Sequence, residues 1–365
     1  MNHRKRPPPT RTLPVPRVGL LASLVVVVFV ALLAWATTWA VTDDGDGTSA
    51  ATRESQTQPS GGSGETDGPD DGGRGTGSRK AGQAGEAKLE KSVRRFRAAQ
   101  RKLAERVSKQ LALRSAPVEF RVATFNVLGD SHTGPGGNKP SFPDAGPRMD
   151  LAIAALRANA VEVVGFQEFE ATQYGMFTAR AGEYSLYPGL SLGNKSVRFN
   201  IAWRSSAFTL VEAHTLSVPY AGGNRIEMPV VLLESTATKR RAWFANFHNA
   251  ADTPRLGNNA RWRANAASVE IAHLTELYEQ TGYPVVVTGD FNERAAIFCQ
   301  FTAGGVFSAA AGGTNVGGCS PPPSMQIDWI FGSTGVQFDS YSVTDTGGAS
   351  DHSLVHARAT LVAVE

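Results

Sequence analysis

The chain from residue 117 onward predicts an α+β domain with largely antiparallel sheets flanked by helices. Two observations support this fold class. Apolar runs with strand character are mixed with helical stretches, and several strand-like runs follow one another without a helix between them. The sustained alternation of strand and helix that is typical of an open parallel sheet is not seen. No internal repeat at solenoid periods is visible either.

The predicted elements follow the spacing of the apolar residues. Helical spacing is present at 148–159 and 259–280. Strand-like apolar runs are present at 119–127, 161–169, 200–204, 228–233, 242–248, 285–288, 327–331 and 354–364.

The N-terminal segment predicts a membrane anchor. Residues 1–17 are basic, and residues 18–41 form a run of 24 residues without a charge. At about 1.5 Å per residue, such a helix crosses a hydrocarbon layer of roughly 30 Å. Aspartates follow at once, so we expect a cytoplasmic tail at 1–17, a single span in the cell membrane and an extracellular catalytic domain. A cleaved signal peptide is the alternative, although its apolar run is usually only about 7–15 residues.

Two segments connect the predicted anchor to the domain. Residues 42–85 are rich in glycine and lack large apolar side chains, which predicts a disordered linker. Residues 86–114 predict a basic amphipathic helix, for which three interpretations stay open: packing against the domain, a short coiled coil with Gln100 in its seam, or contact with anionic polymers or lipid. Its apolar face consists of Leu89, Val93, Phe96, Leu103, Val107 and Leu111.

Charge and composition exclude several classes. Apolar residues make up 41% of the chain and charged residues 19%, which excludes collagen-like, disulfide-dense and wholly disordered proteins. The net charge of +3 divides into +5 for 1–41, −4 for 42–80, +7 for 81–116 and −5 for 117–365. The negative charge of the last segment disfavours tight non-specific binding of DNA, which depends on neutralising phosphates.

The two cysteines, Cys299 and Cys319, lie in a segment rich in glycine and alanine. On the oxidising side of a membrane, a disulfide across this loop would contribute roughly 3 kcal/mol by the loop-closure model. Two free thiols are the alternative. A zinc site is not predicted, because no further Cys or His lies at a suitable spacing.

Polar residues lie at the ends of the apolar runs, where a rigid scaffold presents side chains to a cleft. Each one alone has an ordinary explanation, such as a turn, a strand cap or a satisfied core histidine. Asp328 is the hardest to explain in this way, because a carboxylate inside an apolar strand is costly without a partner. Together they form one candidate site: Asn126, Glu168, His248, Asp290, Asn292, Asp328, Asp351 and His352.

These residue types suit one kind of chemistry. Amide and carboxylate oxygens are ligands for Mg²⁺, Mn²⁺ or Ca²⁺, and two histidines could transfer protons. A phosphate-binding P-loop is absent, because the glycine-rich stretches lack a following Lys-Ser/Thr. The combination indicates metal-assisted attack of water on phosphorus.

The motifs Phe-Asn, Gln-Glu, Gly-Asp-Phe-Asn, Ile-Asp-Trp-Ile-Phe and Ser-Asp-His, in this order, resemble those of the endonuclease/exonuclease/phosphatase superfamily over about residues 119–363. Its members are metal-dependent phosphoesterases, including deoxyribonucleases, abasic-site endonucleases, sphingomyelinases and inositol polyphosphate 5-phosphatases. The resemblance implies a four-layer sandwich for residues 117–365, with two sheets face to face and helices outside. It also implies that Asn126, Glu168 and Asp351 hold the metal, which we expect to be Mg²⁺, with Mn²⁺ or Ca²⁺ as alternatives.

The resemblance implies catalytic roles for five further residues. Asp290 would activate the attacking water, and Asn292 would hydrogen-bond the phosphate. His248 would stabilise developing charge or protonate the leaving group. His352, paired with Asp328, would act on the phosphate or the nucleophile, and this pairing should favour the charged imidazole.

Some family features differ. The Trp-Cys-Asp-Arg stretch of inositol phosphatases is absent, which weakens that assignment. The cysteine pair resembles the disulfide placement of secreted deoxyribonucleases. In secreted deoxyribonucleases a carboxylate partners the first histidine, and the candidates for it here are Glu170, Glu183 and Glu212. Two arginines are candidate phosphate ligands or solvated strand-edge residues, namely Arg198 and Arg204.

The sequence therefore favours an anchored, extracytoplasmic, metal-dependent phosphodiesterase that resembles a nuclease. A phospholipase, sphingomyelinase or phosphatase acting on head groups is the alternative, with Tyr184, Tyr187 and Tyr220 as candidate loop aromatics for lipid contact. A catalytically idle binding domain is the third hypothesis. No protein partner is evident from the sequence.

Overall fold

The computed structural model describes residues 77–192 and 198–363. The predicted tail, the apolar run at 18–41 and the linker up to residue 76 lie outside this part of the chain. Within the described residues, no helix has both the length and the apolar character needed to cross a bilayer.

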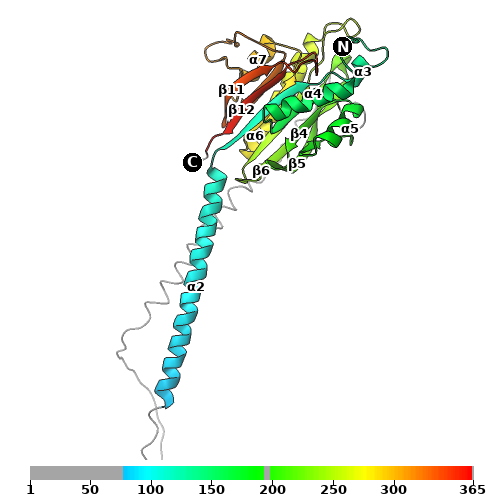
Figure 1. Ribbon diagram of the computed structural model, residues 1–365. Coiled ribbons are helices and arrows are strands. Elements are labelled where there is room, and N and C mark those ends of the chain that lie inside the picture. Colours follow the sequence, from blue (N-terminus) through cyan, green and yellow to red (C-terminus); the bar gives the residue numbers. More distant parts are fainter. Residues whose placement is uncertain (1–76, 193–197, 364–365) are drawn as a thin grey trace, which may run out of the picture. The chain divides into compact units, whose positions relative to one another are not determined.

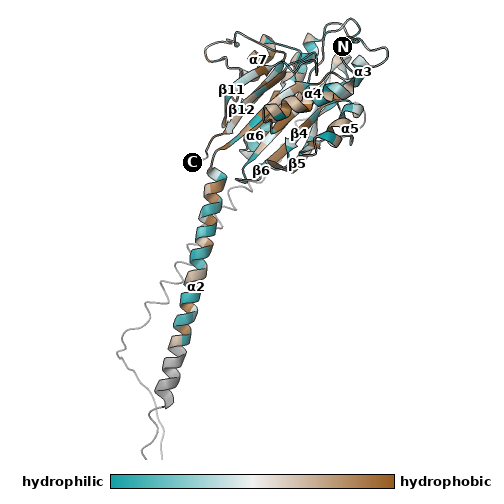
Figure 2. Cartoon of the chain, viewed as in Figure 1, coloured by the Kyte–Doolittle hydropathy of each residue, from teal (hydrophilic) through white to brown (hydrophobic). Residues whose placement is uncertain are grey.

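The basic amphipathic helix is present as α2 (Gly77–Ser115). It begins nine residues before the predicted residue 86, so it includes the end of the segment that we expected to be disordered. Adding residues to an existing helix is much less costly than starting one, and Ala81, Ala84 and Glu86 are good helix formers. Polar and apolar residues alternate along α2 (Figure 2). Its six apolar side chains are 38–65% exposed, so the described chain does not cover this face.

The first sheet contains six strands in the order β11-β12-β1-β2-β4-β3. Its two central strands, β1 and β2, are parallel, and the other neighbours are antiparallel. The bounds are β1 Val118–Asn126, β2 Val163–Gln167, β3 Tyr184–Tyr187, β4 Asn200–Arg204, β11 Val336–Thr344 and β12 Leu354–Leu361.

The second sheet repeats this plan in the order β5-β6-β7-β8-β10-β9. Here β7 and β8 are the parallel pair, and the remaining neighbours are antiparallel. The bounds are β5 Phe208–Pro219, β6 Arg225–Ser235, β7 Arg241–His248, β8 Val285–Asp290, β9 Phe307–Ala309 and β10 Asp328–Ser333.

Three hydrophobic clusters separate four layers (Figure 1). Alternate residues of a strand point to opposite faces, so Val122 packs between the sheets and Ala123 packs beneath the helices. The helices α4 (Ala145–Ala158) and α5 (Ala171–Arg180) cover the first sheet, and α6 (Ala260–Thr281) and α7 (Ala295–Thr302) cover the second. The predicted α+β four-layer sandwich is confirmed.

Short elements complete the described fold: α3 (Asp130–Thr133) follows β1, and the 3-10 helix η1 (Ala221–Gly223) follows β5. The predicted disulfide between Cys299 and Cys319 is confirmed, and it links α7 to the loop before β10.

A buried polar cluster joins the two sheets behind their site-bearing ends. Gln167 donates a hydrogen bond to Asn246 Oδ1 at 2.7 Å, and Thr288 donates to the same oxygen at 3.2 Å. Asn246 in turn donates to the carbonyl of Phe166 at 2.7 Å. A Cβ at Gly165 would lie only 2.0 Å from Thr288 Oγ1, so the glycine in this strand allows the sheets to approach.

Candidate active site

The two parallel strand pairs explain why the polar residues meet. Parallel strands end at the same edge of a sheet, so Asn126 pairs with Gln167, next to Glu168, and His248 pairs with Asp290. The antiparallel strand β10 begins at this edge, which places Asp328 opposite Asp290. The face-to-face packing brings the two edges together.

Asn126 connects the two sheets through its amide group. Its Nδ2 donates to Glu168 Oε1 at 3.1 Å and to Asp290 Oδ2 at 3.0 Å. Its Oδ1 accepts a hydrogen bond from the Leu128 backbone at 3.0 Å. In this orientation the amide nitrogen, rather than the oxygen, faces the carboxylates. The predicted role of Asn126 as a metal ligand stays a prediction.

Glu168 carries the negative charge on the first-sheet side of the site. Burial alone would raise its pKa, but the hydrogen bond from His132, the charge of His248 and the hydrogen bond from Asn126 together hold it well below the usual range. Its Oε2 also accepts a hydrogen bond from the Gly129 backbone at 3.2 Å. Glu168 is therefore ionised and fixed in position.

His132 is the site residue that sequence reasoning missed. Its Nε2 lies 3.2 Å from Glu168 Oε2, and its Nδ1 lies 2.7 Å from Asn138 Oδ1. The hydrogen bond with Glu168 raises the pKa of His132 to about 9, against the opposing effect of burial. The residue lies in the short helix α3, within a glycine-rich stretch that has no recognisable motif, so only the contact with Glu168 reveals it.

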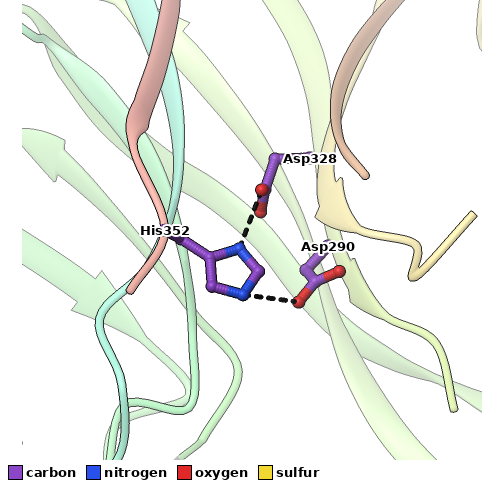
Figure 3. A group of neighbouring side chains, drawn as sticks. All are labelled: Asp290, Asp328 and His352. Carbon is purple, nitrogen blue, oxygen red and sulfur yellow. Dashed lines mark hydrogen bonds and ion pairs between the residues drawn. The ribbon is translucent and has the colours of Figure 1, made fainter. Parts of the chain in front are cut away.

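Asp290 lies between two histidines. Its Oδ2 is 3.5 Å from His248 Nε2 and 3.8 Å from His352 Nε2. The other nitrogen of His352 binds Asp328 Oδ2 at 2.8 Å (Figure 3). The predicted Asp328–His352 pair is therefore present, and it faces Asp290.

The Asp328–His352 pair holds a proton. Burial alone would lower the pKa of His352, but the carboxylates of Asp328 and Asp290 raise it. Burial and the charge of Asp290 raise the pKa of Asp328. Ligand atoms of these three residues lie within 4.8 Å of one another, as a metal site requires. Because Asp328 and His352 share a short hydrogen bond, we interpret them as a proton-holding pair next to Asp290.

Asn292 supports the site from behind. Its backbone nitrogen donates to Asp290 Oδ1 at 2.9 Å, and its side chain donates to the Asn249 carbonyl at 2.9 Å. Asp351 forms an ion pair, with Oδ2 2.7 Å from Lys139 Nζ, and its charge contributes to the raised pKa of His352. The structure thus brings seven of the predicted residues together or next to one another, while the carboxylate of Asp351 is engaged by a lysine. Its role as a metal ligand stays a prediction.

Three of the six non-glycine residues with positive φ among the described residues lie at this site. Leu128, Glu168 and Asn292 have positive φ angles of 52°, 54° and 50°, which non-glycine residues rarely adopt. Such strain costs on the order of 1 kcal/mol for each residue and is typical of functional sites. Buried Arg148 supports the first turn by donating to the carbonyls of Val127 at 2.7 Å and Leu128 at 2.6 Å.

Most of the remaining charged candidates have structural partners, and Glu212 lies exposed on β5, where its charge acts on His214. Glu170 binds Ser131 and Arg198, and Glu183 pairs with Arg157. Among the described residues, the carboxylate found next to the His248 ring is Asp290. Arg204 donates to the Val161 carbonyl and lies over the Tyr184 ring, so its contacts are those of a structural arginine.

A pocket of about 600 Å³ opens next to the catalytic candidates. His132, Glu168 and His248 line it together with further polar and cationic side chains, of which the sequence suggested Arg198 and Tyr220. These are Arg198, Tyr220, Asn224 and Arg225. The pocket therefore combines an ionised carboxylate, imidazoles and guanidinium groups.

A family model described as the Endonuclease/Exonuclease/phosphatase family matches residues 123–352, from β1 to the Ser-Asp-His motif. The chain belongs to this family. The endonuclease/exonuclease/phosphatase fold and the predicted phosphoesterase activity are thereby confirmed. Among the curated proteins no match was found.

Solved structures share the family fold. A family protein from Bacteroides thetaiotaomicron aligns with a TM-score of 0.55 and 17% identity over 67% of this chain and 98% of its own. A mannosyl-6-phosphatase from the same organism gives 0.53 and 18%, over 66% and 99%. TDP2 of D. rerio, complexed with a single-strand DNA product, gives 0.50 and 17%, over 66% and 98%. At this identity the likeness concerns the fold.

Proposed function

We propose that this phosphoesterase hydrolyses phosphodiester bonds of nucleic acid with the help of a divalent metal ion, outside the cell and anchored through residues 18–41. The convergence on Asp290 Oδ2 carries the phosphodiesterase assignment. Asn126 lies 3.0 Å, His248 3.5 Å and His352 3.8 Å from this oxygen. A carboxylate so arranged can accept a proton from water while the imidazoles contact the phosphate.

The donor set fits a hard divalent cation. Several carboxylates share a largely buried cluster, which costs free energy unless cations balance them. Glu168 stays ionised there, and Asp328 Oδ1 has no hydrogen-bond partner among the described residues. A bound ion polarises the phosphoryl group and neutralises its developing charge. Glu168 would hold it, with Asn126 and Asp351 as the ligands predicted from sequence.

The chain's own residues supply the remaining steps. Asp290 orients the attacking water and accepts its proton. His352, kept protonated by Asp328, donates hydrogen bonds to the phosphoryl oxygens. His248, whose ring also contacts the Asp290 carboxylate, donates to the oxygen of the leaving group. Asn292 holds the Asp290 carboxylate in place through its backbone nitrogen.

The pocket supports a polyanionic substrate. Arg198 and Arg225 line it beside Glu168 and His248, so phosphates next to the cleaved one would meet cationic side chains. A nucleic acid strand provides such phosphates, and the same fold holds a single-strand DNA product in TDP2. The lipid alternative has less support, because Tyr184 is buried and Tyr187 and Tyr220 are half-buried.

The extracytoplasmic location is supported by the charge asymmetry around residues 18–41 and by the disulfide between Cys299 and Cys319. Disulfides persist in oxidising compartments and are rare in the cytosol. Fusing a reporter to the C-terminus and testing protease access in intact cells would check this topology. Protection of the reporter would contradict it.

A substrate panel tests the activity. Purified full-length protein should cleave single-stranded DNA or plasmid with Mg²⁺ or Mn²⁺, and a chelator should abolish cleavage. Glu168→Ala should lower the rate by orders of magnitude, whereas Glu279→Ala, an exposed carboxylate on α6, should not. Hydrolysis of sphingomyelin, phosphatidylinositols or phosphate monoesters in preference to DNA would favour the alternative substrates. If Glu168→Ala were as active as the wild-type protein on every substrate, the hypothesis of a catalytically idle binding domain would be favoured.

A further inference from the structure

His132 and Glu168 present two ligand-type atoms to the same point of the pocket. The imidazole Nε2 and the carboxylate Oε2 are 3.2 Å apart, and both residues line the cavity. They come from different elements, since His132 belongs to α3 and Glu168 follows β2. A nitrogen and an oxygen at this separation can bind one cation together.

The His132 ring is oriented as the ring of a metal ligand usually is. An amide oxygen can only accept a hydrogen bond, so the 2.7 Å contact with Asn138 Oδ1 places a proton on Nδ1. This contact directs Nε2 toward Glu168. Histidines that bind metals commonly donate their second nitrogen to a carbonyl or carboxylate, which fixes the tautomer and the ring plane.

The loop around His132 is held firmly. The His132 backbone nitrogen donates to the Gly129 carbonyl at 3.0 Å, and the Lys139 nitrogen donates to the His132 carbonyl at 2.8 Å. The next-door residue Ser131 binds Glu170 through its backbone at 2.8 Å and its hydroxyl at 2.7 Å. A Cβ at Gly137 would lie 2.2 Å from the His132 carbonyl oxygen, so the loop closes tightly over this residue.

We infer that His132 is a nitrogen ligand of the divalent ion, which it shares with Glu168, and that the site therefore prefers a first-row transition ion such as Mn²⁺ over Mg²⁺. The inference rests on the metal dependence proposed above and adds a residue outside the motifs. Imidazole suits transition metals, whereas Mg²⁺ favours oxygen ligands and retains water. The competing explanation is a protonated His132 that only pairs with Glu168 and leaves when an ion enters.

Electron paramagnetic resonance of Mn²⁺ bound to the full-length protein separates these explanations. Nitrogen that is bonded directly to Mn²⁺ produces a characteristic modulation in pulsed spectra, independent of any activity. The wild-type protein should show this modulation, and His132→Ala should lose it. His214→Gln, which alters a histidine that contacts His273 rather than the site, should retain it. His248→Gln should retain it as well, which excludes His248 as the source of the nitrogen.

Affinity provides a second measurement. By titration calorimetry, His132→Ala should weaken Mn²⁺ binding by at least about tenfold while changing Mg²⁺ binding less. Asn138→Ala leaves the imidazole in place but removes its orientation, so it should weaken Mn²⁺ binding in the same direction. Circular dichroism melting of each variant confirms that the loop change has not unfolded the domain.

The outcomes distinguish the inference about His132 from the proposed metal-dependent function. Mn²⁺ that binds the wild-type protein without nitrogen modulation, or with modulation unchanged in His132→Ala, overturns the inference and leaves the metal-dependent function standing. Equal losses of Mn²⁺ and Mg²⁺ affinity in His132→Ala overturn the proposed ion preference. A wild-type protein that binds neither ion overturns both the inference and the proposed function.

Discussion

Glu270 is a fully buried acid directly behind the site. It lies on α6, where Asn249 donates to its Oε2 at 3.4 Å, while its Oε1 has no partner among the described residues. Burial raises the pKa of Glu270 to about 8, and the hydrogen bond from Asn249 only partly opposes this effect. The native state therefore keeps a proton that the unfolded chain has already lost at neutral pH.

This buried proton predicts a pH-dependent stability. The contribution of Glu270 is fully present below its ordinary pKa of 4.5 and is lost as the pH rises through about 8. Between these values the free energy of unfolding should fall by up to roughly 1.4 kcal/mol per pH unit. Glu270→Gln should flatten this dependence in urea unfolding at several pH values. Glu279→Gln, an exposed change on the same helix, should not, and an equal slope in all three proteins would contradict the prediction.

The Asp328–His352 pair predicts a change in the pH profile of catalysis. Asp328→Asn keeps the shape but removes the charge that raises the pKa of His352. The alkaline limb of kcat/KM should move to lower pH, and the rate should fall by about 10²–10⁴-fold.

The double variant provides the control for this pair. Because Asp328 acts through His352, Asp328→Asn combined with His352→Ala should be no slower than His352→Ala alone. Independent, multiplying losses would show that the two residues do not act as a unit.

The central strands explain why the fold could be predicted from sequence. Strands such as β7 and β8 are buried on both faces, so they form continuous apolar runs that are visible without an alignment. The edge strands β3, β9 and β11 are short or half-exposed, and most of β5 is exposed or half-buried. Their sequences carry little apolar signal, and the prediction did not find them.

The same difference applies to the site. Residues at the ends of the central strands could be predicted because motif and strand occur together in the sequence. His132 and the Asp351–Lys139 pair depend on how the loops between elements fold back, which local spacing does not encode. The same is true of the partner of Asn126, since its contact with Asp290 spans 164 positions.

Gly165 in β2 predicts an effect at the scale of the sheets. An added methyl group would press on Thr288 and Asn246 of the facing sheet, so Gly165→Ala should destabilise the domain by about 1–3 kcal/mol. Gly175→Ala lies inside helix α5, where a Cβ meets nothing within 4 Å, and should stabilise it by roughly 0.5–1 kcal/mol. Thermal unfolding of both variants checks the prediction. Similar shifts in the two would show that the sheets accommodate a methyl group at residue 165.

The net positive charge of the molecule lies outside the segment that carries the catalytic residues. Residues 81–116 carry +7 and the catalytic segment carries −5, so attraction to a polyanion should depend on α2 rather than on the pocket alone. Replacing Arg94, Arg97 and Arg101 with Gln should weaken DNA binding and reduce its salt dependence, by up to roughly 0.9 in the logarithmic slope for each phosphate contact removed.

Hydrolysis of a small phosphodiester serves as the control for this variant and should be unchanged. An unchanged salt slope with DNA would instead show that nucleic acid is bound by the catalytic segment alone. In that case α2 would not bind the substrate, and its exposed apolar face would favour the coiled-coil interpretation.

The single amide of Asn126 couples the two halves of the sandwich at the place where the reaction occurs. One of its hydrogen bonds goes to each half, so a shear of one sheet against the other would change the spacing of Glu168 and Asp290 at once. An inhibitor that clamps these two carboxylates would therefore slow deuterium uptake by backbone amides in β1 and in β8 together. The catalytic centre would thus also hold the two sheets together.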